Sequence, residues 1–161
     1  MKTTSQVLFA AILTAAALFA AASDAHAHEI KIGNLVIHHP WIRQPIGSAN
    51  VASAYTSIDN TGSTNDVLIR ITIEKVPTVQ IHEMMMQGDV MKMTEMAKGM
   101  MIPAGKTVEL KPKSSHIMMM GIKLAFTVGE QVKGTFEFAK AGKTDVEFEV
   151  VEPGADMPMQ Y

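Results

Sequence analysis

The chain has 161 residues, and its 14 Lys and Arg residues nearly balance its 16 Asp and Glu residues, for a formal net charge of −2 at pH 7. This balance gives no electrostatic reason to expect a nucleic acid or an anionic membrane surface as a partner. The sequence contains no cysteine, which excludes a thiolate nucleophile, a Cys-rich zinc site and a Cys-ligated copper or iron–sulfur centre.

The first 27 residues have the three-part pattern of a secretory signal peptide. Lys2 gives a positive start, residues 7–22 form an almost unbroken apolar run, and Ala25 and Ala27 fit the small-residue cleavage rule. The run is shorter than the ~18–20 residues that span a bilayer, and no basic stop-transfer cluster follows it. We expect cleavage after Ala27, with cleavage after Ala25 as the alternative, and export to the periplasm as a protein that is not inserted in the membrane.

The rest of the chain consists of short apolar segments separated by Gly, Pro, Asn and Asp, which is typical of an antiparallel β-sandwich or barrel. We expect one domain over residues 28–152, long enough to bury its own core, and a flexible tail over residues 153–161. Only residues 94–100 favour a helical turn, which Lys98-Gly99 limits. The expected strands are 35–37, 41–42, 52–58, 67–73, 79–86, 90–93, 107–110, 116–122, 132–138 and 146–151.

Methionine is concentrated in one part of the chain. Of the 14 methionines, 11 lie between Met84 and Met120. A single methionine in a β-rich protein is most often a filler of the core, because its unbranched side chain adapts to irregular gaps. We expect a role in the core or its wall for five of them. These are Met85, Met96, Met100, Met101 and Met119.

Strand periodicity places other methionines of this region beside a histidine. Side chains alternate between the two faces of a strand, so His82, Met84 and Met86 share one face. A two-residue turn at Gly88-Asp89 brings Met93 opposite Met84. A turn one residue earlier brings Met93 opposite His82 instead. Either register puts five side chains on one face: His82, Met84, Met86, Met91 and Met93.

A second strand carries the same residue types, because His116 and Met118 share a face and Met120 lies beyond them. Imidazole and thioether are neutral ligands that suit Cu(I), a soft ion, better than Mg²⁺ or Ca²⁺. Thioethers also persist in an oxidising compartment, where a free thiol tends to form a disulfide. The two His-x-Met pairs therefore predict a Cu(I) site whose neutral ligands favour transfer of the ion over retention.

Five motifs in this part of the chain together form a recognisable pattern. They are His82-Glu83-Met84, Met91-Lys92-Met93, Ile102-Pro103-Ala104-Gly105, Val108-Glu109-Leu110-Lys111-Pro112 and His116-Ile117-Met118-Met119-Met120-Gly121. With them, the sequence resembles the periplasmic copper chaperone family PCu(A)C over residues 35–151. The resemblance implies a cupredoxin-like Greek-key β-sandwich. It also implies that one Cu(I) is bound by four side chains, His82, Met93, His116 and Met118.

One residue more than is usual in that family separates Met93 from His116, which makes Met91 the substitute ligand. Met84 and Met120 are further auxiliary candidates. The resemblance implies delivery of copper to the copper centre of respiratory cytochrome oxidase, often alongside a thioredoxin-like copper protein. We expect a monomer without enzymatic activity, with a dithiol copper protein or the oxidase copper-centre subunit as the acceptor. Two alternatives stay open: a periplasmic copper-buffering or resistance protein, and a Met-rich structural sandwich that binds no metal.

Three other groups of histidine and methionine are less suited to this site. His38-His39 are neighbours in sequence, so in a strand they point to opposite faces, and we expect both at the surface. Cleavage after Ala25 would expose His26-Ala27-His28, and His28 alone would follow cleavage at the later site; either N-terminus suits Cu(II). Met157-Pro158-Met159 lies in the tail, which we expect to be disordered, with an auxiliary copper contact as the alternative.

Overall fold

The computed structural model describes residues 29–155, in which eleven strands and no helix are present. No helix in this range is therefore available to cross a membrane. The predicted signal peptide, the N-terminal histidines His26 and His28, and the tail methionines Met157 and Met159 lie outside the described residues. The strands are β1 (Glu29–Ile32), β2 (Leu35–Arg43), β3 (Val51–Asn60), β4 (Asp66–Ile73), β5 (Thr78–Gln87), β6 (Val90–Glu95), β7 (Met100–Ile102), β8 (Thr107–Leu110), β9 (His116–Met120), β10 (Gln131–Phe138) and β11 (Gly142–Val151).

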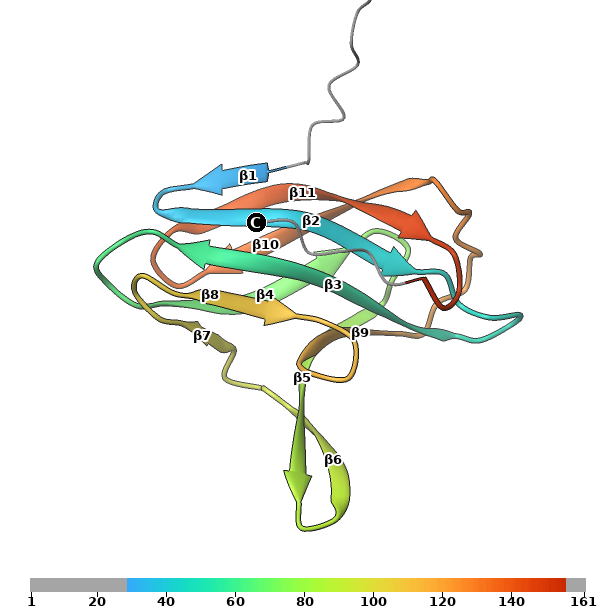
Figure 1. The fold of residues 1–161 in the computed structure, drawn as a ribbon. Coiled ribbons are helices and arrows are strands. Elements are labelled where there is room, and N and C mark those ends of the chain that lie inside the picture. Colours follow the sequence, from blue (N-terminus) through green and yellow to red (C-terminus); the bar gives the residue numbers. More distant parts are fainter. Residues whose placement is uncertain (1–28, 156–161) are drawn as a thin grey trace, which may run out of the picture.

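The strands form one open sheet in the order β6-β5-β9-β3-β2-β11-β10-β4-β7, with β1 added to β2 and β8 added to β3. The sheet folds over on itself, so that β2, β3 and β8 lie in front of β4 and β10 (Figure 1). Neighbours that are distant in sequence, such as β3 beside β9 and β4 beside β10, give the crossed connections of a Greek key. The expected all-β, cupredoxin-like sandwich is confirmed.

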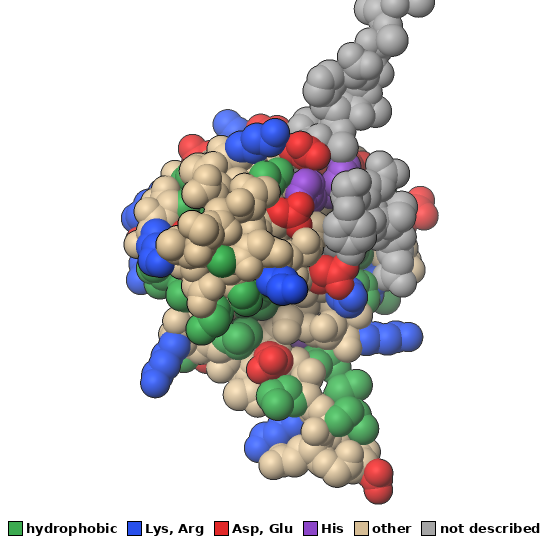
Figure 2. Space-filling view, turned by 60° about the vertical axis from the view of Figure 1, so that its left-hand side comes forward, with side chains coloured by type: hydrophobic (Ala, Val, Ile, Leu, Met, Phe, Trp, Pro, Cys, Tyr) green, Lys and Arg blue, Asp and Glu red, His purple; other side chains and the backbone are tan. Residues whose placement is uncertain are grey.

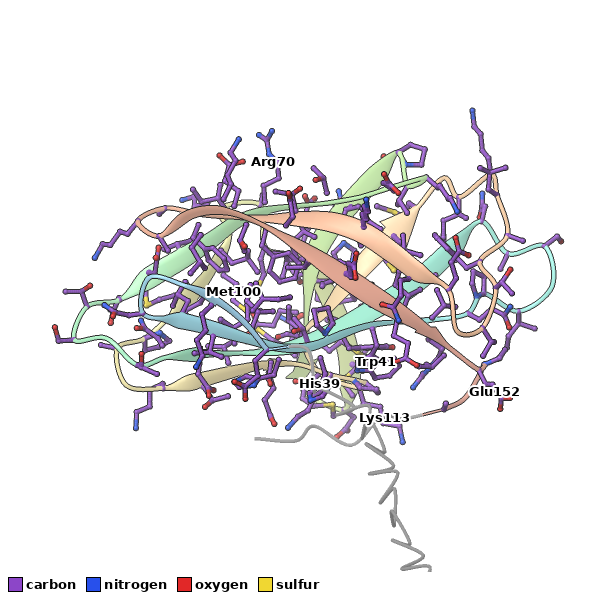
Figure 3. The ribbon with its side chains drawn as sticks, turned by 90° about the horizontal axis from the view of Figure 1, so that it is seen from above. His39, Trp41, Arg70, Met100, Lys113 and Glu152 are labelled. Carbon is purple, nitrogen blue, oxygen red and sulfur yellow. The ribbon has the colours of Figure 1, made fainter. Side chains whose placement is uncertain are left out.

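The core fills the space between the two layers with alternate side chains of each strand. In β10, Val132, Phe136 and Phe138 are at most 3% exposed, whereas Lys133 between them faces solvent. Figure 3 shows Met100 lying inside the body, while Arg70 points away from it. The largest fully buried side chains are Trp41, Phe126, Phe136, Phe148, Leu35, Ile37, Ile42, Ile58, Leu68, Ile102, Leu110 and Ile117.

Strand β2 is continuous over the region where we expected two separate strands, 35–37 and 41–42. A β-bulge between His38 and Trp41, with His39 at a φ of +42°, absorbs the irregularity that Pro40 introduces. His38 lies before the bulge, on the face opposite to that of the core residue Ile37, and is nevertheless only 6% exposed. Its Nε2 lies 3.0 Å from Oδ2 of Asp59, and its Nδ1 lies 3.6 Å from Oε1 of Glu29. The prediction of a surface position is therefore wrong for His38, whereas His39 remains partly exposed.

The segment that follows β6 turns without forming a helix. Gly99 donates its backbone N–H to the carbonyl of Met96 at 2.8 Å and has a φ of +85°. A Cβ at Gly99 would lie 2.5 Å from the carbonyl oxygen of Leu68, so only glycine fits this close approach. The chain then forms β7, a strand that we did not predict, which pairs with β4. The prediction of a helical turn over residues 94–100 is wrong.

The hairpin formed by β5 and β6 projects from the sandwich (Figure 1). The first half of β5, Thr78 to His82, pairs with β9, and the second half, His82 to Gln87, pairs with β6. Gly88, with a φ of +64°, opens the two-residue turn that joins β5 to β6. His82 therefore marks the point at which the hairpin leaves the body of the protein.

Candidate metal site

Two imidazoles face each other across neighbouring strands. In the antiparallel pairing of β5 with β9, His82 lies directly opposite His116. Their ring centroids are 5.9 Å apart, and the ring planes are inclined by 61°. Ile81, which precedes His82, and Ile117, which follows His116, point into the core and are 6% and 0% exposed. Because side chains alternate along a strand, the two histidines point away from the core. Both imidazoles therefore lie on the outer face of this part of the sheet.

A hydrogen bond fixes which nitrogen of His116 can bind a metal. Its Nδ1 lies 2.9 Å from the carbonyl oxygen of Ser114, in the turn before β9. A carbonyl oxygen can only accept, so Nδ1 carries the proton and Nε2 keeps its lone pair. The His116 imidazole is only 5% exposed, so its orientation is held by packing as well as by this hydrogen bond. Such a bond to the opposite ring nitrogen is the usual support of a metal-binding histidine.

The other imidazole carries an unpaired lone pair. Nε2 of His82 lies 2.9 Å from Oε1 of Gln80, which precedes it by two residues on the same face of β5. With Nε2 as the donor, Nδ1 is left as an acceptor, and it is buried without a hydrogen-bond partner among the described residues. Buried polar atoms in folded proteins are nearly always paired, so an unpaired one requires an explanation. A metal ion bound at Nδ1 would supply one.

The surroundings of His82 favour the neutral form of its imidazole. Burial lowers the pKa of His82 below 6.5, and the neighbouring His116 lowers it further, whereas the carboxylate of Glu95 raises it in part. Glu95 lies opposite His82 on β6, on the other side from His116. A metal ion binds the neutral form of histidine, so a lowered pKa keeps the site available at mildly acidic pH.

Met93 and Met118 flank the two imidazoles on the same face. Met93 lies opposite Met84, in the pair that follows His82 on this face towards the hairpin turn, and is 46% exposed. Met118 lies opposite Gln80, in the pair that follows His116 on this face in the other direction, and is partly buried. Successive pairs on one face are separated by about 7 Å, which the flexible methionine side chain can largely span.

The auxiliary candidates occupy the next positions on this face. Met84 follows His82 along β5, Met91 lies opposite Met86 nearer the turn, and Met120 lies opposite Thr78. The pairing of Met84 with Met93 is the register expected from a turn at Gly88-Asp89, and the alternative register, with Met93 opposite His82, is wrong. Met93 is thus nearer to the imidazoles than Met91 is.

The donor set on this face is unsuited to a hard metal ion. Among residues 29–155, no three His, Cys, Asp or Glu side chains gather as metal ligands. The face offers two imidazoles and several thioethers, a combination that fits a soft ion.

Two polar neighbours, Gln80 and Glu95, were missed in the sequence analysis. Gln80 was recognisable from its position two residues before His82 on the same strand, and Glu95 from the hairpin register.

The comparisons with known proteins agree with this fold. Residues 35–150 match the family described as putative lipoprotein LpqE-like. A putative lipoprotein of Leifsonia xyli subsp. xyli is 29% identical over 106 residues, which are 66% of this chain and 63% of that protein. This chain therefore spans less than two thirds of the length of that relative.

Two solved structures are similar over most of the chain. The copper-bound PCuAC domain from PmoF2 has a TM-score of 0.67 and 26% identity, covering 78% of this chain and 99% of that domain. The apo PCuAC domain from PmoF1 has a TM-score of 0.67 and 27% identity, covering 78% of this chain and 100% of that domain. These similarities confirm the resemblance seen in the sequence motifs. The chain therefore belongs to the LpqE-like family, and its fold is that of the PCu(A)C domains.

Proposed function

We propose that this protein is a periplasmic copper chaperone that carries one Cu(I) as its cargo. His82 and His116 supply the nitrogen ligands, and Met93 and Met118 supply the sulfur ligands. The observation that carries the proposal is the buried Nδ1 of His82, which has no partner among the described residues and belongs to a ring 5.9 Å from that of His116. The similar domain from PmoF2 is copper-bound, which supports the choice of metal.

The chemistry of the face favours the monovalent ion. Thioether sulfur is soft and uncharged, so it binds Cu(I) in preference to ions that require carboxylate or carbonyl oxygen. A lone pair is available on Nδ1 of His82 and on Nε2 of His116, because the opposite nitrogen of each ring is hydrogen-bonded. None of these four ligands carries a charge, so the bound ion keeps its full positive charge.

This ligand set favours release to an acceptor. An acceptor with two cysteine thiolates is anionic and binds Cu(I) more strongly than imidazole and thioether do. Met93, which is 46% exposed on the projecting hairpin, is accessible to such a partner while the imidazoles stay in the body of the protein. A dithiol copper protein or the copper centre of a respiratory oxidase would receive the ion.

The test of the proposal is the anaerobic partition of Cu(I) between the loaded protein and a reduced dithiol copper protein. We expect copper to move to the acceptor at pH 7, and the paired variant His82→Ala/His116→Ala to carry no copper to transfer from this site. The variant His39→Asn, which alters a histidine outside the site, is the control and should transfer copper as the wild type does. Copper that stays on the wild-type protein against excess acceptor would contradict delivery and indicate storage.

A further inference from the structure

The outer part of the β5–β6 hairpin carries two methionine pairs that the proposed copper site does not fully use. Met84 lies opposite Met93, and Met86 lies opposite Met91. Met86, Met91 and Met93 are 62%, 49% and 46% exposed, and Met84 is partly buried. Figure 2 shows hydrophobic side chains along the hairpin where it projects from the body. These side chains belong to neither hydrophobic core cluster, so core packing does not account for them.

The geometry of the hairpin brings these thioethers close together. In a hairpin closed by a two-residue turn, the pair next to the turn, Gln87 and Val90, exchanges backbone hydrogen bonds. The next pair along the strands, Met86 and Met91, is then of the non-hydrogen-bonded type, as is Met84 with Met93. In such pairs the Cα atoms are about 4.5 Å apart and the side chains approach more closely.

The same face of the hairpin contains no charged side chain at these two pairs. The charged residues Glu83 and Lys92 lie on the opposite face, where Lys92 pairs with Met85. Towards the body, the first charged group on the methionine face is Glu95, in the next pair on that face, opposite His82. At the other end, Asp89 lies in the turn and is an acidic residue. A cation at the outer pairs therefore meets thioether sulfur and no competing ammonium group.

We propose that Met84, Met86 and Met91 form a second Cu(I) site, made of thioethers alone and separate from the histidine site. The identity of the metal rests on the proposed function. Three neutral sulfur ligands are suited to Cu(I) and to its analogue Ag(I), and exclude hard divalent ions. Because Met86 and Met91 are exposed, this site exchanges its ion with solution or with a partner more readily than the histidine site does. It binds the ion more weakly, because it lacks imidazole.

The experiment titrates the mature protein with Cu(I) under anaerobic conditions and follows the methyl groups of ¹³C-methyl-labelled methionine by NMR. In the wild type, the first equivalent should shift the Met118 signal, and the second should shift those of Met86 and Met91. The variant Met86→Leu/Met91→Leu should lose only the second equivalent. Met85→Leu is the matched control, because Met85 is 56% exposed on the same strand but points to the opposite face, and it should retain both.

The paired variant His82→Ala/His116→Ala separates this proposal from the proposed function. We expect it to lose the strong first equivalent and still to bind Cu(I) with shifts of the Met86 and Met91 signals. Signals of Met86 and Met91 that do not move in either protein, or a second equivalent that survives Met86→Leu/Met91→Leu, would overturn the second site. A strong first equivalent that survives loss of both histidines would count against the proposed function alone.

Discussion

Met100 and Met119 are 4% and 0% exposed in the body of the sandwich, whereas Met86 and Met91 are 62% and 49% exposed on the β5–β6 hairpin. The side chains are chemically identical, and all four lie in strands. The difference is what lies behind each strand. The inward faces of β7 and β9 meet the core, while the outer half of β5 pairs only with β6 (Figure 1).

Strand β9 shows the same contrast within one element. Met119 points into the core, and its neighbours Met118 and Met120 point to the outer face beside the imidazoles. The role of a methionine in this protein therefore depends on its face and on the neighbouring layer. Inward methionines stabilise the fold, and outward ones are available as ligands.

The largest effect expected from this contrast concerns stability. Met119→Ala leaves a cavity in the core and should lower the free energy of unfolding by about 2–5 kcal/mol. Met86→Ala, at an exposed position, should change it by no more than about 0.5 kcal/mol. Urea unfolding of the apo proteins, followed by circular dichroism, measures both. Equal destabilisation by the two substitutions would mean that the hairpin packs against another part of the protein.

The next effect concerns the affinity for Cu(I). His82→Ala or His116→Ala should each weaken it by at least about 100-fold, since loss of a direct ligand exceeds the 10–100-fold typical of outer-shell partners. Met93→Leu and Met118→Leu should weaken the affinity less, because Met84, Met91 and Met120 can replace a lost thioether. Competition with a chromophoric Cu(I) chelator ranks the four variants. A methionine variant that binds Cu(I) more weakly than both histidine variants would contradict this ranking.

The local part of the site was predictable from the sequence. The period of two along a strand placed His82 with Met84 and His116 with Met118, and the Gly88-Asp89 turn predicted the pairing of Met84 with Met93. The pairing of β5 with β9, which brings His82 opposite His116, joins segments distant in sequence. Neither the spacing nor the composition contains that information.

The errors arose where distant parts of the chain decide exposure. Met96, Met100 and Met119 pack in or against the core as expected, but Met85 and Met101 are 56% and 58% exposed. Met85 belongs to the projecting hairpin, which no inner layer covers. Met101 lies on the outward face of β7, a short strand at the end of the sheet that the sequence pattern did not reveal.

A smaller effect on Cu(I) affinity is expected at Gln80, whose Oε1 accepts a hydrogen bond from Nε2 of His82 and so orients the imidazole ring. Gln80→Leu removes this hydrogen bond and frees the ring to rotate, so Cu(I) affinity should fall by roughly tenfold, as for outer-shell partners of metal-binding histidines. Gln87→Leu is the control, because Gln87 is an exposed glutamine on the opposite face of the same strand. Chelator competition should show unchanged Cu(I) affinity for the control. An unchanged Cu(I) affinity in Gln80→Leu would contradict the positioning role.

The smallest effect is a dependence of apo stability on pH. The pKa of His82 is lowered from 6.5 in the folded protein, so the unfolded chain takes up the proton first as the pH falls. The free energy of unfolding should therefore decline as the pH decreases through 6.5 towards the lowered pKa. Above this range, His82 should not make the free energy of unfolding depend on pH. Urea unfolding between pH 5 and pH 8, with His82→Ala as the reference, measures it. An identical pH profile for both proteins would contradict the lowered pKa.

The central claim is that two imidazoles and thioether sulfur of the outer face hold one Cu(I). X-ray absorption spectroscopy of the mature protein, loaded anaerobically with one equivalent of Cu(I), tests it directly. We predict a shell that contains both imidazole nitrogen and sulfur, and loss of the nitrogen component in His82→Ala/His116→Ala. A shell of sulfur alone, or of nitrogen and oxygen without sulfur, in the wild-type protein would contradict the claim.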